Sequence, residues 1–163
     1  MKERGIFLNI RHVQREDYVQ ISPLINEWWG GRQMADMLPR LFFEHFTDTS
    51  FIAEKDGEII GFLIGFVSQS HEKEAYIHFV GVHPKHRGVS VGNTLYTTFF
   101  EKVRGMGRNT IRCVTSPVNK GSIAYHRKMG FDVVKGDEEV DDVSVHTNYD
   151  GTNQGRVLFK KII

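Results

Sequence analysis

Residues 80–92 read Val80-Gly81-Val82-His83-Pro84-Lys85-His86-Arg87-Gly88-Val89-Ser90-Val91-Gly92, and they say more about the fold than any other stretch. An apolar strand pattern ends here, small residues turn the chain, and a helical pattern begins directly afterwards. Backbone N–H groups at such a helix start point into one concavity, where the helix dipole adds positive charge. The glycines let a ligand approach the backbone, and Lys85-His86-Arg87 add basic side chains. The pattern is typical of a phosphate-binding loop, and equally of an ordinary strand-to-helix turn.

The composition is that of an ordinary globular chain. Of 163 residues, 40% are hydrophobic and 25% are charged. This length predicts a single domain over residues 1–163. Lys plus Arg is 21 and Asp plus Glu is 20, so the net charge of +1 gives no footprint for nucleic acid or a membrane surface. The longest apolar run, residues 59–67, is too short for a bilayer span of about 20 residues. The single cysteine, Cys113, excludes an intrachain disulfide and favours a cytoplasmic location.

Strand and helix patterns extend on both sides of the loop. Asp56-Gly57 between two apolar runs predicts a hairpin, and acidic residues at 16–17 open a helical pattern. The expected strands cover 6–13, 51–53, 59–64, 74–82, 111–115, 131–134 and 156–162, and the other expected helices cover 33–46, 93–103 and 119–129. A hairpin followed by a strand–loop–helix–strand unit predicts a mixed α/β fold, with antiparallel and parallel pairs in one sheet.

The loop resembles that of the GNAT superfamily of acetyl-CoA-dependent N-acetyltransferases. The family's loop reads Arg or Gln, two residues, Gly, one residue, then Gly or Ala, after a strand that ends in Val-His-Pro. Here it is Arg87-Gly88-Val89-Ser90-Val91-Gly92, with Ser90 in place of the central glycine. A second block, Asn119 to Phe131, resembles the family's Asn-x-x-Ala/Ser-Ile helix that ends in Gly-Phe. The two blocks stand in the family's order, and the resemblance covers about residues 10–159.

The resemblance implies a GNAT-like acyl-CoA N-acyltransferase fold, with a central mixed, splayed sheet flanked by helices. Acetyl-CoA would be the co-substrate and no metal would be needed, because an amine attacks the thioester directly through a tetrahedral intermediate. The strand residues Val80 and Val82 would hydrogen-bond the pantetheine arm and polarise the thioester carbonyl, and Asn119 would contact the arm. The pyrophosphate would be held by backbone N–H groups of Arg87, Gly88, Val89, Ser90, Val91 and Gly92.

The resemblance also implies a general acid for the departing thiolate. Many family members have a tyrosine four residues before the glycine of Gly-Phe. Counting back from Gly130 leads to His126, with Tyr125 one place earlier. An imidazolium with a pKa near ~6.5 protonates a thiolate readily. Three possibilities therefore remain open: His126 is the acid, Tyr125 is the acid, or the thiolate leaves without help.

A general base is expected on the strand before the loop, where the family often has a glutamate. His78 shares the parity of Val80 and Val82, so we expect it to orient or deprotonate the amine. The alternative is a histidine that only satisfies its hydrogen bonds in the sheet.

Acidic residues follow Phe131, in the connection that lies beside the acceptor pocket in this fold class. Five acids between Asp137 and Asp142 could attract a cationic amine, or could simply be solvated. His146 and Tyr149 are candidate polar contacts to the acceptor, and Trp28 and Trp29 are candidate apolar walls.

Two functions from different classes fit these residues. The first is an N-acetyltransferase that acts on an amine-bearing small molecule or peptide. The second is a catalytically weak GNAT-like module that binds acyl-CoA and regulates or scaffolds a partner. Ser90 and His126 keep the second function open, because both depart from the family pattern. A nucleotide phosphotransferase is excluded by the lack of Gly-Lys-Ser/Thr at the end of the loop. Family members are often dimers, so a homodimer is expected by analogy.

Overall fold

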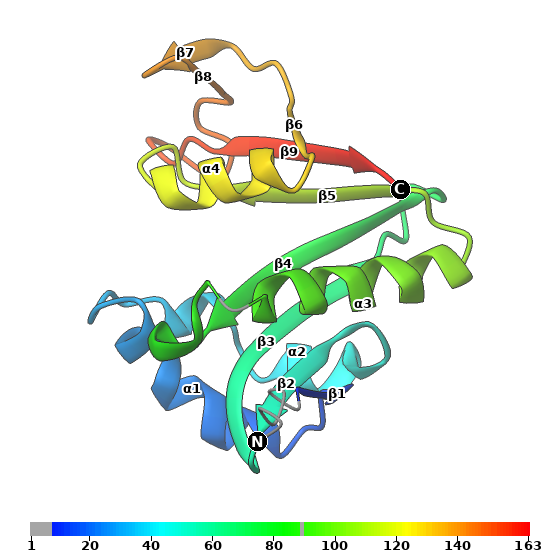
Figure 1. Cartoon of the computed structure of the whole chain (residues 1–163). Coiled ribbons are helices and arrows are strands. Elements are labelled where there is room, and N and C mark those ends of the chain that lie inside the picture. Colours follow the sequence, from blue (N-terminus) through cyan, green and yellow to red (C-terminus); the bar gives the residue numbers. More distant parts are fainter. Residues whose placement is uncertain (1–7, 89) are drawn as a thin grey trace, which may run out of the picture. The chain divides into compact units, whose positions relative to one another are not determined.

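The computed structural model describes residues 8–88 and 90–163, which form two compact units. Unit 1 contains the described residues up to Val67 together with Ile77–Met106, and unit 2 contains Ser68–Tyr76 and Gly107–Ile163. One strand belongs to both units: β4 (Glu74–Val82) begins in unit 2 and ends in unit 1 (Figure 1). The expectation of a single domain stays a prediction.

Unit 1 is a sheet with helices on both faces. Its strands follow the order β1-β2-β3-β4, with antiparallel pairing of β1 with β2 and of β2 with β3. The turn Asp56-Gly57 joins β2 to β3, and both residues have positive φ, as the hairpin signal predicts. The elements are β1 (Asn9–His12), α1 (Asp17–Trp28), η1 (Ala35–Met37), α2 (Leu41–His45), η2 (Thr47–Thr49), β2 (Phe51–Lys55), β3 (Glu58–Val67), η3 (Pro84–His86) and α3 (Val91–Gly105).

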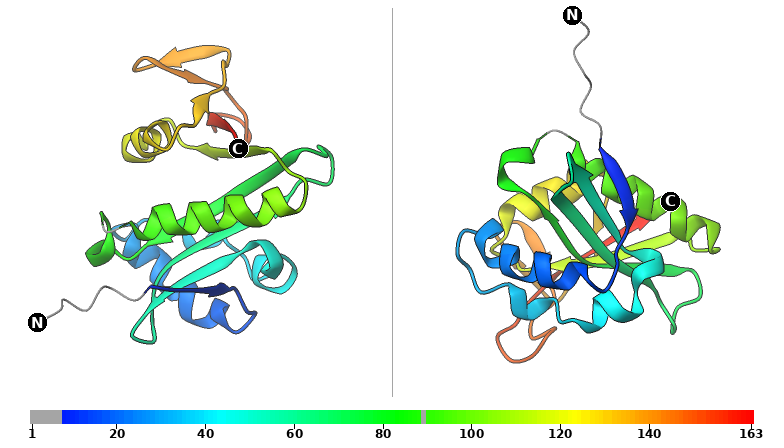
Figure 2. Two further views of the ribbon diagram at one scale, coloured as in Figure 1. Left: turned by 45° about the vertical axis from the view of Figure 1, so that its right-hand side comes forward. Right: turned by 90° about the horizontal axis from the view of Figure 1, so that it is seen from below.

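The core of unit 1 explains why α1 and α3 lie on opposite faces of the sheet (Figure 2). The buried apolar residues of α1 recur at helical spacing and form one cluster with Phe62, Ile64 and Phe79. The alternate face of β3 carries Gly61, which α3 approaches closely. Successive residues of β3 therefore pack alternately against α1 and α3.

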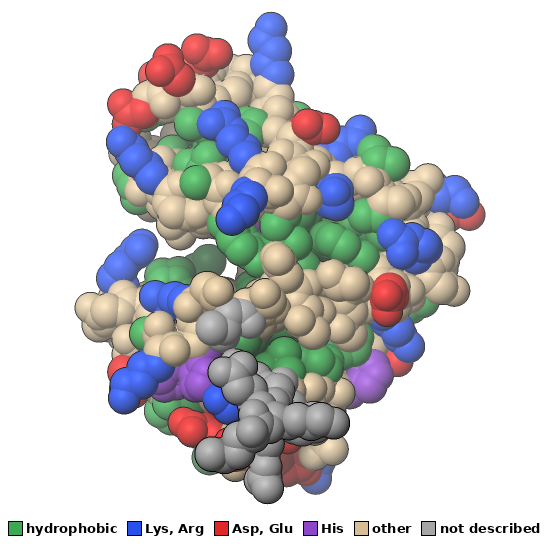
Figure 3. Space-filling view, viewed as in Figure 1, with side chains coloured by type: hydrophobic (Ala, Val, Ile, Leu, Met, Phe, Trp, Pro, Cys, Tyr) green, Lys and Arg blue, Asp and Glu red, His purple; other side chains and the backbone are tan. Residues whose placement is uncertain are grey.

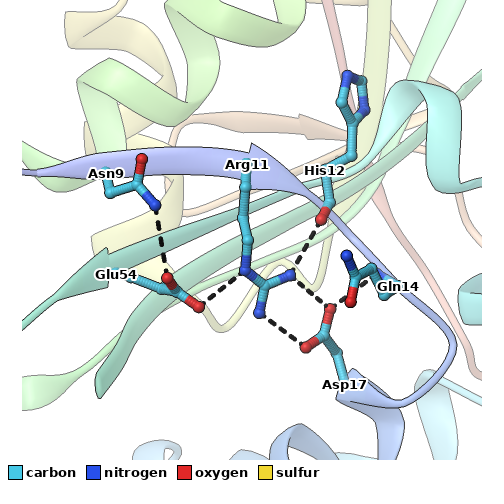
Figure 4. A network of polar contacts seen from close by, with 6 residues as sticks. All are labelled: Asn9, Arg11, His12, Gln14, Asp17 and Glu54. Carbon is cyan, nitrogen blue, oxygen red and sulfur yellow. Dashed lines mark hydrogen bonds and ion pairs between the residues drawn. The ribbon is translucent and has the colours of Figure 1, made fainter. Parts of the chain in front are cut away.

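A polar network fastens the start of α1 to the sheet edge (Figure 4). The Arg11 guanidinium on β1 makes two hydrogen bonds with the Asp17 carboxylate, at 2.9 and 2.8 Å, and one with Glu54 on β2, at 2.7 Å. Asp17 also accepts the backbone N–H of Gln14 at 2.7 Å. The buried Asp17 carboxylate raises the pKa of Arg11 further above its ordinary value. The paired charges thus fix where α1 begins.

Unit 2 is a smaller layer of strands with one helix. The first residues of β4, Glu74–Tyr76, pair in parallel with Thr110–Arg112. β9 runs antiparallel between β5 and β6, and β7 and β8 form a separate hairpin. The elements are β5 (Thr110–Thr115), α4 (Lys120–Lys128), β6 (Asp132–Val133), β7 (Glu138–Val140), β8 (Val143–Val145) and β9 (Val157–Ile162).

The predicted fold class is confirmed. The chain is mixed α/β, and the pairing of β4 with β5 ends after Tyr76, which is the splay that the resemblance implies. Within residues 8–88 and 90–163, no helix has both the length and the apolar character that crossing a bilayer requires.

One expectation about secondary structure was wrong, and one hairpin was not predicted. The helix expected over 33–46 is a short η1 and a separate five-residue α2, because Pro39 lacks an N–H and its ring clashes with a preceding turn. The connection after β6 contains the β7–β8 hairpin, which its polar composition concealed. The strand expected over 6–13 is observed from Asn9, and its first two residues lie outside the described residues.

Replacing Asp17 by Asn should lower the free energy of unfolding by about 2 kcal/mol, because the Arg11 guanidinium would keep Glu54 but lose the buried carboxylate that accepts two of its hydrogen bonds. Glu16→Gln is the matched control. The Arg15–Glu16 ion pair is about 70% exposed on both sides, so the control should leave stability nearly unchanged. Urea unfolding measures both variants, and equal effects would contradict the assigned role.

Candidate functional site

The loop between β4 and α3 presents backbone donors as the sequence predicts. After η3, Gly88 (φ +85°) and Ser90 (φ +69°) both adopt left-handed backbone conformations. At the start of α3, the Thr94 N–H donates to the Ser90 carbonyl at 3.0 Å. The N–H groups of Val91 and Gly92 precede that bond, so they are available to an anion at the helix N-terminus. Val89, predicted to bind pyrophosphate, lies outside the described residues.

Ser90 occupies its position at a steric cost. The left-handed conformation costs a residue with a Cβ roughly 1–2 kcal/mol of conformational energy, whereas for glycine the cost is close to zero. Among the described residues the Ser90 hydroxyl makes no capping hydrogen bond to α3, although serine is a common capping residue. The family's central glycine therefore has a conformational reason, and Ser90 retains the turn under strain.

Arg87 uses its side chain within unit 1. Its Nε donates to the Val82 carbonyl at 3.1 Å and its Nη2 donates to the Trp28 carbonyl at 2.7 Å. Sequence reasoning missed this role, because nothing in the local pattern places Trp28 beside the loop. The guanidinium thus uses two of its five N–H donors on main-chain carbonyls, while the predicted contact with pyrophosphate concerns the backbone N–H of Arg87.

The end of β4 presents the backbone that the resemblance assigns to the pantetheine arm. His83 N–H donates to the Ile60 carbonyl of β3 at 2.8 Å. Because backbone groups alternate in direction along a strand, those of Val80 and Val82 point away from β3. The bond from Arg87 to the Val82 carbonyl agrees with that direction.

His78 lies on the half-buried face of β4 and is held by two contacts. Its ring stacks on Phe42 with centroids 4.2 Å apart and an angle of 4° between planes. Its Nε2 lies 2.6 Å from the Met37 carbonyl. A carbonyl only accepts, so Nε2 carries the proton and Nδ1 carries the lone pair. Burial lowers the pKa of His78, which keeps the ring neutral near pH 7 and able to take a proton.

The two tryptophans differ in exposure. Trp28 is 3% exposed, stacks on Phe62 at 5.9 Å and contacts His83 edge-on at 5.5 Å. Its side chain packs in the core, Trp28 also lines an open cavity of unit 1, and its expected role as a wall of the acceptor pocket stays a prediction. Trp29 is only partly buried and packs on Phe79 at 5.0 Å, so it remains a candidate for contact with an acceptor.

In unit 2, Asn119 is the N-cap of α4. Its side-chain oxygen accepts the Ser122 N–H at 3.2 Å, which satisfies one donor of the first helical turn. An Asn directly before a helical pattern is a common cap signal that the sequence reading did not use. The side-chain amide nitrogen remains the group that could contact the cofactor arm.

Two candidate acids follow on α4, and their environments differ. His126 is 8% exposed and stacks on Phe159 at 4.7 Å. Its Nδ1 lies 2.7 Å from the Ser122 carbonyl, so Nδ1 carries the proton. Burial lowers the pKa of His126, which disfavours the imidazolium that the acid role requires. Burial raises the pKa of the half-buried Tyr125, so its hydroxyl keeps the proton that an acid must donate.

The predicted acceptor residues of unit 2 lie in the β8–β9 connection. His146 and Tyr149 have ring centroids 6.2 Å apart. The His146 Nε2 is buried and has no hydrogen-bond partner among the described residues. Acidic side chains gather at the β7–β8 hairpin (Figure 3). Asp137 at its base accepts hydrogen bonds from the backbone and side chain of Thr147, and Asp141 at its tip lies 3.5 Å from Lys120.

Unit 1 also contains an open cavity of about 590 Å³ between α1 and the β2–β3 turn. Glu27, Asp56 and Glu58 line it together with Trp28 and His83. Carboxylates repel phosphate, so this cavity suits a cation and is not the pyrophosphate site.

Comparison with known proteins identifies the family. Residues 10–131 match the family model described as Acetyltransferase (GNAT) family. The chain belongs to the GNAT family. A GNAT-family protein from Desulfovibrio desulfuricans has a similar structure, with a TM-score of 0.78 at 15% identity, covering 96% of this chain and 99% of that one. The yncA protein of Salmonella typhimurium, solved with acetyl-CoA, gives a TM-score of 0.67 at 18% identity, covering 95% and 93%. These likenesses show the GNAT fold.

A curated relative is L-2,4-diaminobutyric acid acetyltransferase of Nocardia farcinica, which is 31% identical over 84 residues. The match covers 52% of this chain and 44% of that protein. The GNAT chain thus matches less than half the length of this relative. The relatives of this chain are acetyltransferases, and these matches do not identify its own acceptor.

Replacing Ser90 by Gly should raise the free energy of unfolding by about 1 kcal/mol, because glycine adopts the left-handed conformation without the Cβ clash. Thr98→Gly, inside α3, is the control and should lower stability by about 1 kcal/mol. Denaturant unfolding measures both. A loss of stability in the Ser90 variant would show that the serine side chain stabilises the turn.

Replacing His126 by Phe should make stability less sensitive to acid. Burial lowers the pKa of His126 in the folded state, whereas the unfolded chain takes up this proton near pH 6.5. Stability from the neutral ring is therefore complete above about pH 6.5 and is lost as the pH falls, by at most about 1.4 kcal/mol per unit. Unfolding curves between pH 8 and pH 5 (roughly the span over which histidine titrates) test this. An equally steep loss in both proteins would contradict it.

Proposed function

We propose that this GNAT chain is an enzyme that transfers the acetyl group of acetyl-CoA to a primary amine. The observation that carries the proposal is the loop before α3, because Val91 and Gly92 are the first two residues of the helix and their N–H groups have no acceptor within it. These donors, with the helix dipole, suit the charge of a pyrophosphate. A Cβ at Gly88 would meet no described atom within 4 Å, so the loop is open on that side. The residues present therefore fit acetyl-CoA as a co-substrate.

The chain supplies a base for the amine and an acid for the thiolate. His78 is neutral, with its proton on Nε2 and its lone pair on Nδ1, so it can accept a proton from the acceptor's ammonium group directly or through water, which frees the amine to attack. Tyr125 keeps its phenolic proton, so it can protonate the thiolate that leaves. We prefer Tyr125 to His126, because His126 is buried and its Nδ1 proton is bonded to the Ser122 carbonyl. The amine attacks the thioester directly through a tetrahedral intermediate.

The acceptor is proposed to be a small amine or the amine of a peptide. The relative from Nocardia farcinica is named for diaminobutyric acid, a diamine that also carries a carboxylate. In this chain, acids near the β7–β8 hairpin would attract a cationic amine over a distance. Trp29, His146 and Tyr149 are the residues proposed to contact it.

The second candidate function is a module that binds acyl-CoA without efficient catalysis. Two observations favour it: the strained φ of Ser90 in the cofactor loop and the burial of His126. Such a module would bind acetyl-CoA and release no thiol with any amine.

The test has two stages. Calorimetry of the full chain with acetyl-CoA should give micromolar binding, since the loop's donors do not depend on the Ser90 side chain. Thiol release is then measured with a panel of amines that includes diaminobutyrate. Tyr125→Phe should lower kcat by about 100-fold, because general acid catalysis contributes on this scale, and should leave acetyl-CoA affinity within about twofold.

His126→Phe is the matched control on the same helix. It should retain most of kcat, because the proposed acid is intact. Loss of kcat in the His126 variant with normal activity in the Tyr125 variant would reverse the assignment. Binding without thiol release from any amine would support the non-catalytic module instead.

A further inference from the structure

Arg87 connects two parts of unit 1 that are far apart in sequence. One nitrogen of the guanidinium donates to the Val82 carbonyl at the end of β4, and another donates to the Trp28 carbonyl at the end of α1. The Trp28 carbonyl is among the last of α1, which lack partners within the helix and carry partial negative charge. A planar guanidinium reaches two carbonyls in different directions, which a lysine ammonium on its flexible stem does not reproduce.

The segment that begins at Trp28 returns to β4 at its other end. Trp29 packs on Phe79, and a Cβ at Gly81 would lie 2.9 Å from the Trp29 ring. Further along, the Met37 carbonyl accepts the hydrogen bond of His78. The segment from Trp28 to Met37 is thus held by the loop through Arg87 at one end and by His78 at the other.

We propose that Arg87 is a positioning residue that couples acetyl-CoA binding at the loop to the position of the segment Trp28–Met37. This inference rests on the proposed binding of acetyl-CoA. A ligand that favours one conformation of the loop also favours the conformation of whatever the loop holds. Coupling of this kind is reciprocal, so acetyl-CoA would strengthen amine binding beside Trp29 and His78, and the amine would strengthen acetyl-CoA binding. Acetyl-CoA is then expected to prepare the amine side of the enzyme.

The chain has two tryptophans, Trp28 and Trp29, and both lie at this connection. Intrinsic tryptophan fluorescence therefore reports on the connection itself and requires no knowledge of the amine. Calorimetry reports binding of acetyl-CoA independently. The two measurements together separate binding from coupling.

The experiment titrates acetyl-CoA into the full chain and follows heat and tryptophan fluorescence in parallel. The wild-type chain should show both signals with one midpoint. Arg87→Lys keeps the charge and loses the two-carbonyl geometry, so it should bind about tenfold more weakly and lose most of the fluorescence change. Lys85→Gln is the matched control: it removes a positive charge from the same loop, and it should keep the fluorescence change.

Arg87→Gln provides a second variant, whose side chain still has N–H donors but carries no charge. Circular dichroism melting checks that each variant is folded before titration. The proposal is overturned if a folded Arg87→Lys or Arg87→Gln variant gives the wild-type fluorescence change at wild-type affinity. It is also overturned if the wild-type chain gives heat without a fluorescence change. Absence of heat in the wild-type chain would instead refute acetyl-CoA binding, and the coupling with it.

Discussion

Close approach at two glycines sets the position of the loop between β4 and α3. A Cβ at Gly61 would lie 3.0 Å from Val91 on α3, and one at Gly81 would lie 2.6 Å from the Phe62 ring and 2.9 Å from the ring of Trp29. Interiors are close-packed, so an added methyl group in either place would displace its neighbours. Because Val91 is also the first residue of α3, the contact at Gly61 determines where the helix presents its N–H groups. The chemistry of the loop depends on this packing.

Two histidines show how a hydrogen bond to a carbonyl decides which ring nitrogen can act. His78 gives its Nε2 proton to the Met37 carbonyl, which leaves the lone pair on Nδ1. His126 gives its Nδ1 proton to the Ser122 carbonyl of its own helix, and its ring stacks on Phe159. Burial lowers the pKa of both rings, so both are neutral near pH 7. A neutral histidine suits the role of a base and not that of an acid, so the proposed reaction uses His78 as the base and does not use His126 as the acid.

The membership of the chain in the GNAT family and its departures from the family pattern have a common physical basis. The loop motif asks for glycine where φ is positive, and this chain retains the same turn with Ser90 at φ +69°. Arg87 matches the first position of the motif, and its side chain holds the loop to α1. The motif thus describes a backbone shape, and the side chains within it secure that shape. This view explains how a serine is tolerated where a glycine is usual.

Local patterns alone predicted the mixed α/β class, the bounds of β4, the Asp56-Gly57 hairpin and the loop before α3, because each depends on neighbouring residues. The same patterns could not place Trp28 beside Arg87 or Met37 beside His78, since these contacts join residues 59 and 41 positions apart. Nor could they separate Tyr125 from His126, because adjacent residues on a helix differ only in what packs around them. The helix expected over 33–46 is interrupted at Pro39, which is itself a local signal in the sequence. The sequence by itself determined the family and the loop, and tertiary packing decided protonation, burial and which side chains meet, because these depend on neighbours distant in the chain.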